Sequence, residues 1–329
     1  MQFDLHPEKV VFNRTGVSGI KFFLWDCQFG RFFNTGPIKG KGDVTFFLTT
    51  MMWAFAPWAI AGLTTLFING KNIVKKIPLK EYVTFFGFTI MFIVFSVSKF
   101  QLPHYLNIIY PFLAILVADF IIGSISNPKL TLVTKISINI YASFYVVVMI
   151  VLESFFRPDY LFISLILIVC SLFLIIFMNF SKITNRYNHL ILGVLSTMLF
   201  ALFMNLSFYP TLLKYQAGAK SAMYVNKEYP QYNVIATGLD DWLLDYYLKC
   251  KLTRIESISE LDKLRTEPNT LIYTDDNFLK SMRENNLDYT VLKAFDYFHS
   301  TRLNSKFLNH MTRESSIGKR YLIKIDNDH

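Results

Sequence analysis

The chain has 329 residues, of which 53% are hydrophobic and 17% aromatic, and its formal net charge is +9. Apolar content this high exceeds what an ordinary soluble domain carries. Residues 1 to 209 hold 16 basic and 8 acidic side chains, so nearly all of the excess charge lies in the more apolar part of the chain. Charge in that position indicates membrane topology and contact with anionic lipid, and it argues against a protein that binds nucleic acid.

Residues 1–43 form a polar amino-terminal segment with six basic and four acidic side chains. Six apolar runs follow, and each is long enough to cross a hydrocarbon core of about 30 Å at about 1.5 Å per residue. The runs at 82–98 and 160–180 contain no charged residue, which makes burial in a soluble core a weak alternative. We therefore expect a transmembrane domain over residues 44–209 with six helices, placed at 44–68, 82–98, 105–124, 136–156, 160–180 and 189–209.

Basic residues in the loops predict the orientation, because Lys and Arg near the ends of spans are retained on the cytoplasmic side. Two intervening loops hold only Lys99 and Arg157. The three alternate loops hold eight basic residues, namely Lys71, Lys75, Lys76, Lys80, Lys129, Lys135, Lys182 and Arg186. Residues 1–43 and everything after the last span are therefore predicted to lie outside the cytoplasm.

An outer amino-terminal segment needs a means of translocation, and the first 43 residues contain no signal peptide. We expect this sequence to represent the carboxy-terminal part of a longer membrane protein, with further chain upstream of Met1. The alternative is that a short tail crosses the membrane by itself.

Residues 210–329 have a different sequence pattern, in which short β-type runs alternate with amphipathic ones. The strand candidates are "YNVIAT", "LTRIES", "NTLIYT", "DYTVLKAF" and "RYLIKI", and the helix candidates include "DDWLLDYYLKC" and "DDNFLKSMREN". This pattern predicts a soluble α/β domain. Acidic pairs at 240–241 and 275–276 suit helix caps, although strand ends of open α/β sheets also hold ligands.

The stretch "SVSKFQLPHYLNIIYPFLAILVADF", residues 96–120, puts polar residues in an outer turn between two spans. Pro103 stands where a helix can start without losing a hydrogen bond. Lys99 and Tyr105 would present a cation and a phenol to a phosphate at the headgroup level. The alternative is that Lys99 only snorkels and Tyr105 only belongs to the interfacial aromatic belt.

This stretch resembles the signature of membrane glycosyltransferases that take a sugar from a polyprenyl-phosphate carrier, namely the dolichyl-phosphate-mannose protein mannosyltransferases and the lipid A aminoarabinose transferases. The matching residues are Ser98, Lys99, Leu102, Pro103, Tyr105 and Pro111. Phe100 and Gln101 are insertions relative to that pattern. A second match is the aromatic-rich segment that ends in Arg31 and Phe32 and precedes a span containing the dipeptide at 57–58, Pro-Trp.

The resemblance implies a polytopic α-helical membrane protein of the GT-C type with a carboxy-terminal soluble α/β domain over 210–329, in a bacterial inner membrane. It implies transfer of a hexosyl or pentosyl group to a lipid, glycan or protein acceptor on the outer face. The carrier phosphate would be bound by Arg31, Lys99 and Tyr105, supported by Gln28, Gln101 and His104. The acidic catalytic base, and any divalent metal, are expected upstream of Met1, so this chain alone is expected to be inactive and to hold no cofactor or metal.

The other candidate residues have weaker support for a function. Asp119 is an ionisable residue in or near the inner end of the third span and is therefore a functional candidate, but its expected place near the cytoplasmic interface favours a role at the helix end. Glu153 and Arg157 are four residues apart and are expected to pair. Cys27 and Cys250 are both predicted outside, so a bridge between them stays open. The competing hypothesis for the whole chain is a non-enzymatic membrane protein, for transport or scaffolding, with an outer α/β domain.

Overall fold

The computed structural model describes residues 2–5, 8, 15–35, 39–125, 127–180, 187–239, 241–264 and 269–325. Their contacts form two compact units. Unit 1 consists of Met1–Val146 with Ser171–Met198, and unit 2 consists of Val147–Cys170 with Leu199–His329. The domain boundaries predicted at residues 43 and 209 stay predictions.

Unit 1 begins with short helical segments. They are α1 (Gln2–Leu5), α2 (Gly19–Lys21), the π-helical turn η1 (Phe22–Asp26) and α3 (Phe29–Phe33). Asn34 ends α3 in the left-handed conformation, with a φ of 61°. Asn tolerates this conformation better than most residues with a Cβ, so the chain turns sharply after α3.

Apolar helices then follow, and the first predicted span is divided between two of them. These helices are α4 (Phe46–Ala54), α5 (Ala59–Val74), α6 (Tyr82–Val97), the 3-10 helix η2 (Pro103–Ile108) and α7 (Tyr110–Ser124). The peptide bond Ala56-Pro57 between α4 and α5 is cis. Phe47 and Met51 of α4, Ala61 of α5, Phe88 of α6 and Leu113 of α7 share one buried core, so both halves of that span belong to the same core as α6 and α7.

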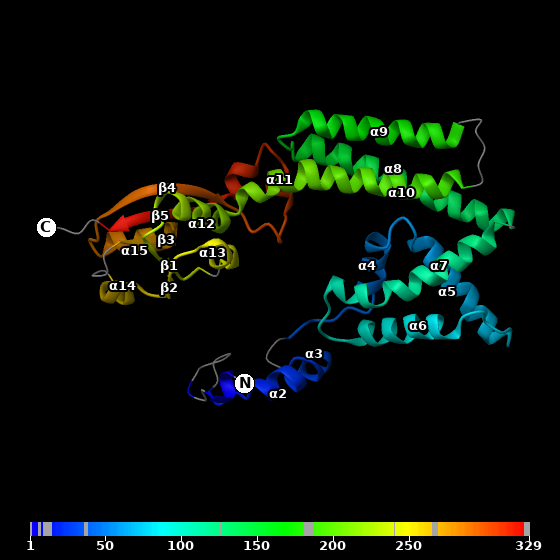
Figure 1. Cartoon of the computed structure of the whole chain (residues 1–329), viewed down its shortest axis with the longest axis horizontal. Coiled ribbons are helices and arrows are strands. Elements are labelled where there is room, and N and C mark those ends of the chain that lie inside the picture. Colours follow the sequence, from blue (N-terminus) through cyan, green and yellow to red (C-terminus); the bar gives the residue numbers. More distant parts are fainter. Residues whose placement is uncertain are drawn as a thin grey trace. The chain divides into compact units, whose positions relative to one another are not determined.

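Three longer helices contribute residues to both units: α8 (Pro128–Phe155), α9 (Leu161–Phe180) and α10 (Asn188–Phe203). They run side by side (Figure 1), and the Asn179 amide of α9 donates a hydrogen bond of 2.7 Å to the Asn139 carbonyl oxygen of α8. In unit 2, a buried contact of 2.6 Å between the hydroxyls of Ser164 and Ser207 joins α9 to the π-helical turn η3 (Met204–Phe208). Polar pairs of this kind hold helices together in lipid.

The segments Pro128–Phe155, Leu161–Phe180 and Asn188–Tyr215 are long and apolar enough to cross a membrane, and α6 and α7 are shorter apolar helices. Large apolar side chains on α9 are widely exposed, including Phe162 at 77% and Phe180 at 82%. Such a surface requires lipid around it. The prediction of an integral membrane protein is confirmed, whereas the count of six spans stays a prediction.

Unit 2 also contains a five-stranded sheet (Figure 1), which confirms the predicted carboxy-terminal α/β part. The order is β2-β1-β3-β5-β4, with β1 parallel to β2 and β3, and with β5 antiparallel to β3 and β4. The strands are β1 (Asn233–Thr237), β2 (Leu252–Ile255), β3 (Thr270–Asp275), β4 (Tyr289–Tyr297) and β5 (Gly318–Ile325). The helices and short turns around it are α11 (Tyr209–Leu212), η4 (Leu213–Tyr215), α12 (Ala217–Glu228), α13 (Trp242–Tyr247), α14 (Ile258–Leu264), α15 (Asp276–Glu284), α16 (Ser305–Leu308) and η5 (Arg313–Ser316).

Successive residues of the central strands belong to different cores, as the alternation of side chains along a strand requires. Val234 and Leu271 pack in one core with residues of α12 and α13. Ile235 and Ile272 pack in a second core with residues of α14 and α15. The sheet is therefore buried on both faces. Of these helices, α12 is one for which the sequence patterns predicted no element.

The structure confirms the predicted helix caps but not the predicted ion pair. Asp241 accepts from the backbone N–H groups at the start of α13, and Asp275 accepts from the Phe278 N–H at the start of α15, so both predicted caps are confirmed. Asp240 lies outside the described residues.

The predicted pair of Glu153 with Arg157 is wrong, since neither forms an ion pair among the described residues and one Glu153 carboxylate oxygen is buried without a hydrogen bond there. The three cysteines are free thiols, so the bridge between Cys27 and Cys250 is absent from the structure.

Candidate functional site

The predicted phosphate-binding turn joins the end of α6 to η2 in unit 1. Helix α6 ends at Val97, and Pro103 occupies the first turn of η2, as its fixed φ and missing N–H favour. The backbone of Lys99 is held by a hydrogen bond of 3.2 Å from its N–H to the carbonyl oxygen of Phe32, at the end of α3. The side chain of Lys99 is exposed and forms no ion pair within the described part of the chain.

Arg31, from α3, lies beside the same turn. Its guanidinium carbon is 5.1 Å from the centre of the Phe100 ring, which is the geometry of a cation–π contact. The Nε atom of Arg31 is buried and has no hydrogen-bond partner among the residues that the structure describes. A buried donor without a partner is costly, so Arg31 has hydrogen-bonding capacity left for a ligand.

Two glycines let the segment before α4 approach the turn closely. A Cβ atom at Gly40 would lie 2.3 Å from the carbonyl oxygen of Lys99, and one at Gly42 would lie 2.9 Å from its Cα atom. Gly42 also has a φ of +51°, a conformation that favours glycine. The exposed lysines at 39 and 41 flank Gly40 in the chain, so two further cations belong to the segment that touches the turn.

Gln101 ties the same two segments together. Its amide nitrogen donates a hydrogen bond of 3.1 Å to the carbonyl oxygen of Ser96, and its amide oxygen accepts one of 2.8 Å from the backbone N–H of Asp43. The Asp43 carboxylate in turn accepts from both the N–H and the hydroxyl of Thr45, and these bonds lower its pKa below the usual value. The structure thus gives Gln101 a positioning role in this turn.

The remaining predicted residues lie around the turn with fewer contacts. The ring of Tyr105 packs 6.1 Å from that of Phe95, in the last turns of α6, and 5.0 Å from that of His104. The Tyr105 hydroxyl has no hydrogen-bond partner among the described residues, and His104 is exposed. Gln28 is an exposed residue that caps α3 through its backbone only.

The arrangement is therefore a turn, residues 98–102, that is held by hydrogen bonds to α3 and to Asp43 and that carries cations at its surface. It is called the braced turn below. Arg31 supplies a cation held against Phe100, Lys99 supplies an exposed cation on a fixed backbone, Gln101 ties the turn to Asp43, and the glycines permit the close approach. Phe100 and the glycines were missed as functional residues in the sequence. The glycine spacing in "GKGD" is a signal for such a close approach, whereas the contact between Arg31 and Phe100 spans almost 70 residues and has no local signal.

A cavity of about 520 Å³ in unit 2 is a weaker candidate. Three of its charged groups are engaged within the protein: Lys319 pairs with Asp296 at 3.0 Å, and Arg313 lies 4.2 Å over the Phe156 ring while donating to the Phe156 carbonyl oxygen. Within the described residues, no three His, Cys, Asp or Glu side chains come together as a group that could hold a metal.

No known family pattern matches the chain, and no curated protein matches it by sequence. In fold, the chain is similar to ArnT from Cupriavidus metallidurans, in a crystal structure with bound undecaprenyl phosphate. The TM-score is 0.64 at 16% identity, and the match covers 92% of this chain and 55% of the ArnT chain. The chain thus spans about half the length of that protein, and the likeness shows a shared fold.

Proposed function

We propose that this chain is the carrier-binding part of a GT-C membrane glycosyltransferase that takes a sugar from a polyprenyl phosphate. The observation that carries the proposal is the fold shared with ArnT, whose crystal structure holds undecaprenyl phosphate, over 92% of this chain. The braced turn adds support, because Arg31 packs on Phe100, the neighbour of Lys99 in the chain, and the Lys99 N–H binds the carbonyl oxygen of Phe32, the neighbour of Arg31. The Nε atom of Arg31 also has no partner among the described residues.

The proposed roles follow from the chemistry of each side chain. Arg31 would bind the carrier phosphate through its planar fork of donors, and Lys99 would bind it as a point charge. Tyr105 would donate its free hydroxyl to a phosphate oxygen. Gln28 and His104 are exposed enough to support the same anion, while Gln101 supports it by holding the turn.

In the transfer step, an acceptor hydroxyl attacks the anomeric carbon as the bond from that carbon to the phosphate oxygen breaks. Polyprenyl phosphate leaves with the bonding electron pair, and the acceptor's proton goes to a base. Positioned cations stabilise the charge that grows on the leaving phosphate, which is the part of catalysis proposed for Arg31 and Lys99. Asp43 is a poor candidate for the base, because its carboxylate already accepts hydrogen bonds from the N–H and the hydroxyl of Thr45.

The proposed setting is a bacterial inner membrane, with the turn and the α/β part on the outer face. The acceptor there would be a lipid, a glycan or a protein. The excess of lysine and arginine in the alternate loops supports this orientation.

The test is binding of undecaprenyl phosphate to the purified 329-residue chain in nanodiscs. Arg31→Ala and Lys99→Ala should each weaken binding by roughly 10-fold, the loss of one charge-assisted hydrogen bond. Lys71→Ala is the matched control, because it removes an exposed lysine at the other end of the apolar helices. Binding that is equal in all four proteins would overturn the proposal and favour a non-enzymatic membrane protein for transport or scaffolding.

A further inference from the structure

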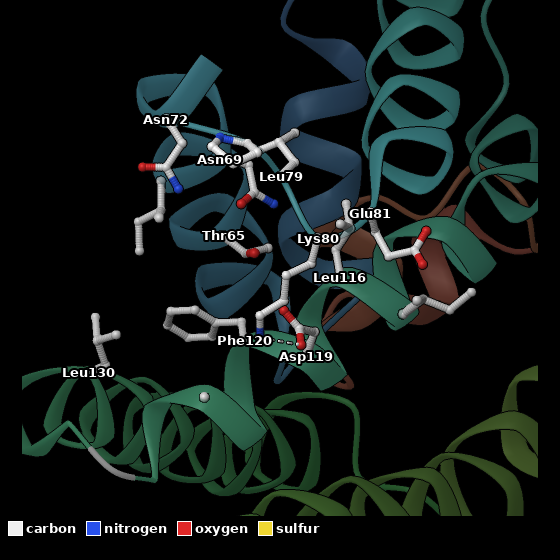
Figure 2. Close-up of a pocket in the computed structure, with 14 residues that line it drawn as sticks. Thr65, Asn69, Asn72, Leu79, Lys80, Glu81, Leu116, Asp119, Phe120 and Leu130 are labelled. Atoms are coloured by element: carbon white, nitrogen blue, oxygen red, sulfur yellow. Dashed lines mark hydrogen bonds and ion pairs between the residues drawn. The ribbon is translucent and has the colours of Figure 1, made fainter. Parts of the chain in front are cut away.

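A second polar site lies in unit 1, away from the turn. It is a cavity of about 340 Å³ between the carboxyl-terminal halves of α5 and α7, the loop that precedes α6 and the start of α8 (Figure 2). This volume is at the lower end of small-molecule sites, which are roughly 300–1,000 Å³. Lys80 and Glu81 border the cavity just before α6, whereas Lys99 follows its other end. The 16 residues of α6 separate the two sites by about 24 Å.

One wall of the cavity is a polar stripe on α5. Thr65, Asn69 and Asn72 are spaced by four and three residues, which puts them on one helix face, and Figure 2 shows all three on the same side of the cavity. The two asparagine side chains are half-buried, and neither makes a hydrogen bond with any described residue. Half-buried amides without protein partners are suited to bind a ligand with oxygen or N–H groups.

The opposite wall carries charge of both signs. The Lys80 ammonium lies 3.0 Å from an Asp119 carboxylate oxygen, as Figure 2 shows, and Glu81 borders the cavity beside them. Both partners of the ion pair are widely exposed, at 76% and 54% of their side chains. An exposed pair contributes little stability, so each partner can exchange the other for a ligand group at small cost.

The rest of the lining is apolar and lies in a protein that is surrounded by lipid. Ile68, Leu116, Phe120 and Leu130 line the cavity. Ile122 follows the lining residue Phe120 by two positions on α7. Its side chain is 69% exposed, as expected for a surface that contacts acyl chains. The cavity therefore combines the Lys80 cation, the Asp119 carboxylate and two free amides with apolar walls, which matches an amphiphile whose headgroup carries both charges.

We propose that this cavity binds a phospholipid with a zwitterionic headgroup that bears a primary ammonium, the phosphatidylethanolamine class. Lys80 and the two asparagine amides bind the phosphate, and Asp119 accepts hydrogen bonds from the ammonium. Phosphatidylglycerol brings no cation and would leave Asp119 facing an anion. Phosphatidylcholine brings a cation without N–H donors, so it cannot donate hydrogen bonds to Asp119.

The experiment is native mass spectrometry of the purified full chain with added phosphatidylethanolamine, phosphatidylglycerol or phosphatidylcholine. Phosphatidylethanolamine should bind best. Lys80→Ala should weaken its binding by roughly 10-fold, and Asp119→Asn should weaken it while leaving phosphatidylglycerol binding unchanged or stronger. Asn69→Ala, which leaves the ion pair intact, should weaken both lipids. Lys75→Ala, on the same loop but outside the cavity lining, is the control for loop charge.

Equal binding of the three lipids, or an equal loss in Lys75→Ala and Lys80→Ala, would overturn the proposal. Glycerophosphoethanolamine, the headgroup without acyl chains, should compete with the lipid. Competition by inorganic phosphate at the same concentration would instead identify a plain anion site and would also overturn it. Because the altered groups are exposed or only half-buried, all four variants should keep the thermal unfolding midpoint of the unaltered chain, which verifies that they fold.

Discussion

The guanidinium of Arg31 lies over the ring of Phe100, with 5.1 Å between its central carbon and the ring centre. The contact joins α3 to the turn that follows α6. Phe100 is one of the two residues that this chain inserts in the signature it otherwise resembles, and the second, Gln101, bonds the turn to Asp43. The insertion therefore braces the residues proposed to bind phosphate.

Replacing Phe100 by Leu should weaken binding of undecaprenyl phosphate by about 2- to 5-fold, because a cation–π contact that is not fully desolvated contributes about 0.5–1 kcal/mol. Arg31→Lys should weaken it more, since lysine keeps the charge but loses the planar fork of donors. The measurement is a binding isotherm in nanodiscs for each variant. If Arg31→Lys binds as the unaltered chain does, Arg31 acts only through its charge.

Replacing Gly40 by Ala should destabilise unit 1 by about 1–3 kcal/mol, the usual cost of overpacking, because the added Cβ would meet the Lys99 carbonyl oxygen at 2.3 Å. The same variant should weaken carrier binding, since the Lys99 backbone must move. Gly70→Ala is the control, because no atom beyond its chain neighbours and the local helix backbone lies within 4 Å of its Cβ position on α5. That variant should be neutral or stabilising. Thermal unfolding in detergent compares the two, and equal midpoints would contradict the close approach.

Replacing Asp275 by Ala should lower the free energy of local opening of α15 by about 1–2 kcal/mol. It removes the cap of that helix and the carboxylate that lies 3.2 Å from Arg320, in a pair of which only about a fifth of each side chain is exposed. Glu284→Ala, at the other end of α15, breaks only an exposed pair with Lys280 and should change little. Hydrogen exchange of the α15 amides measures both, and similar protection in the two variants would refute the difference.

Tyr321 should ionise at unusually high pH. Its hydroxyl donates a 2.7 Å hydrogen bond to the Asp276 carboxylate, and this bond, followed by burial, raises the pKa of Tyr321 to about 12. Since the pKa is higher in the folded state, the stabilisation is complete below the unfolded value of about 10 and is lost as the pH rises through about 12.

The ultraviolet titration curve of the Tyr321→Phe variant is subtracted from that of the unaltered chain. The difference should show one phenol that ionises near pH 12. Urea unfolding should show that the variant loses less stability between pH 10 and that value than the unaltered chain does. A difference step near the ordinary phenol value of about 10 would contradict the hydrogen bond.

The sequence by itself determined the features that depend on neighbouring residues. Alternating runs predicted the strands of the α/β part, because successive side chains of a strand face opposite sides. The caps at Asp241 and Asp275 followed from their place between a strand and a helix, and the apolar helices followed from their composition.

Tertiary structure alone decided the contacts that join distant segments. It placed Arg31 on Phe100, Gly40 against Lys99, and Lys80 beside Asp119 across an asparagine stripe on α5. It also divided the first predicted span into α4 and α5. The physical reason is that local patterns report how a residue meets its own helix, strand or solvent. Pairing across about 40 to 70 residues depends on the packing of the whole unit.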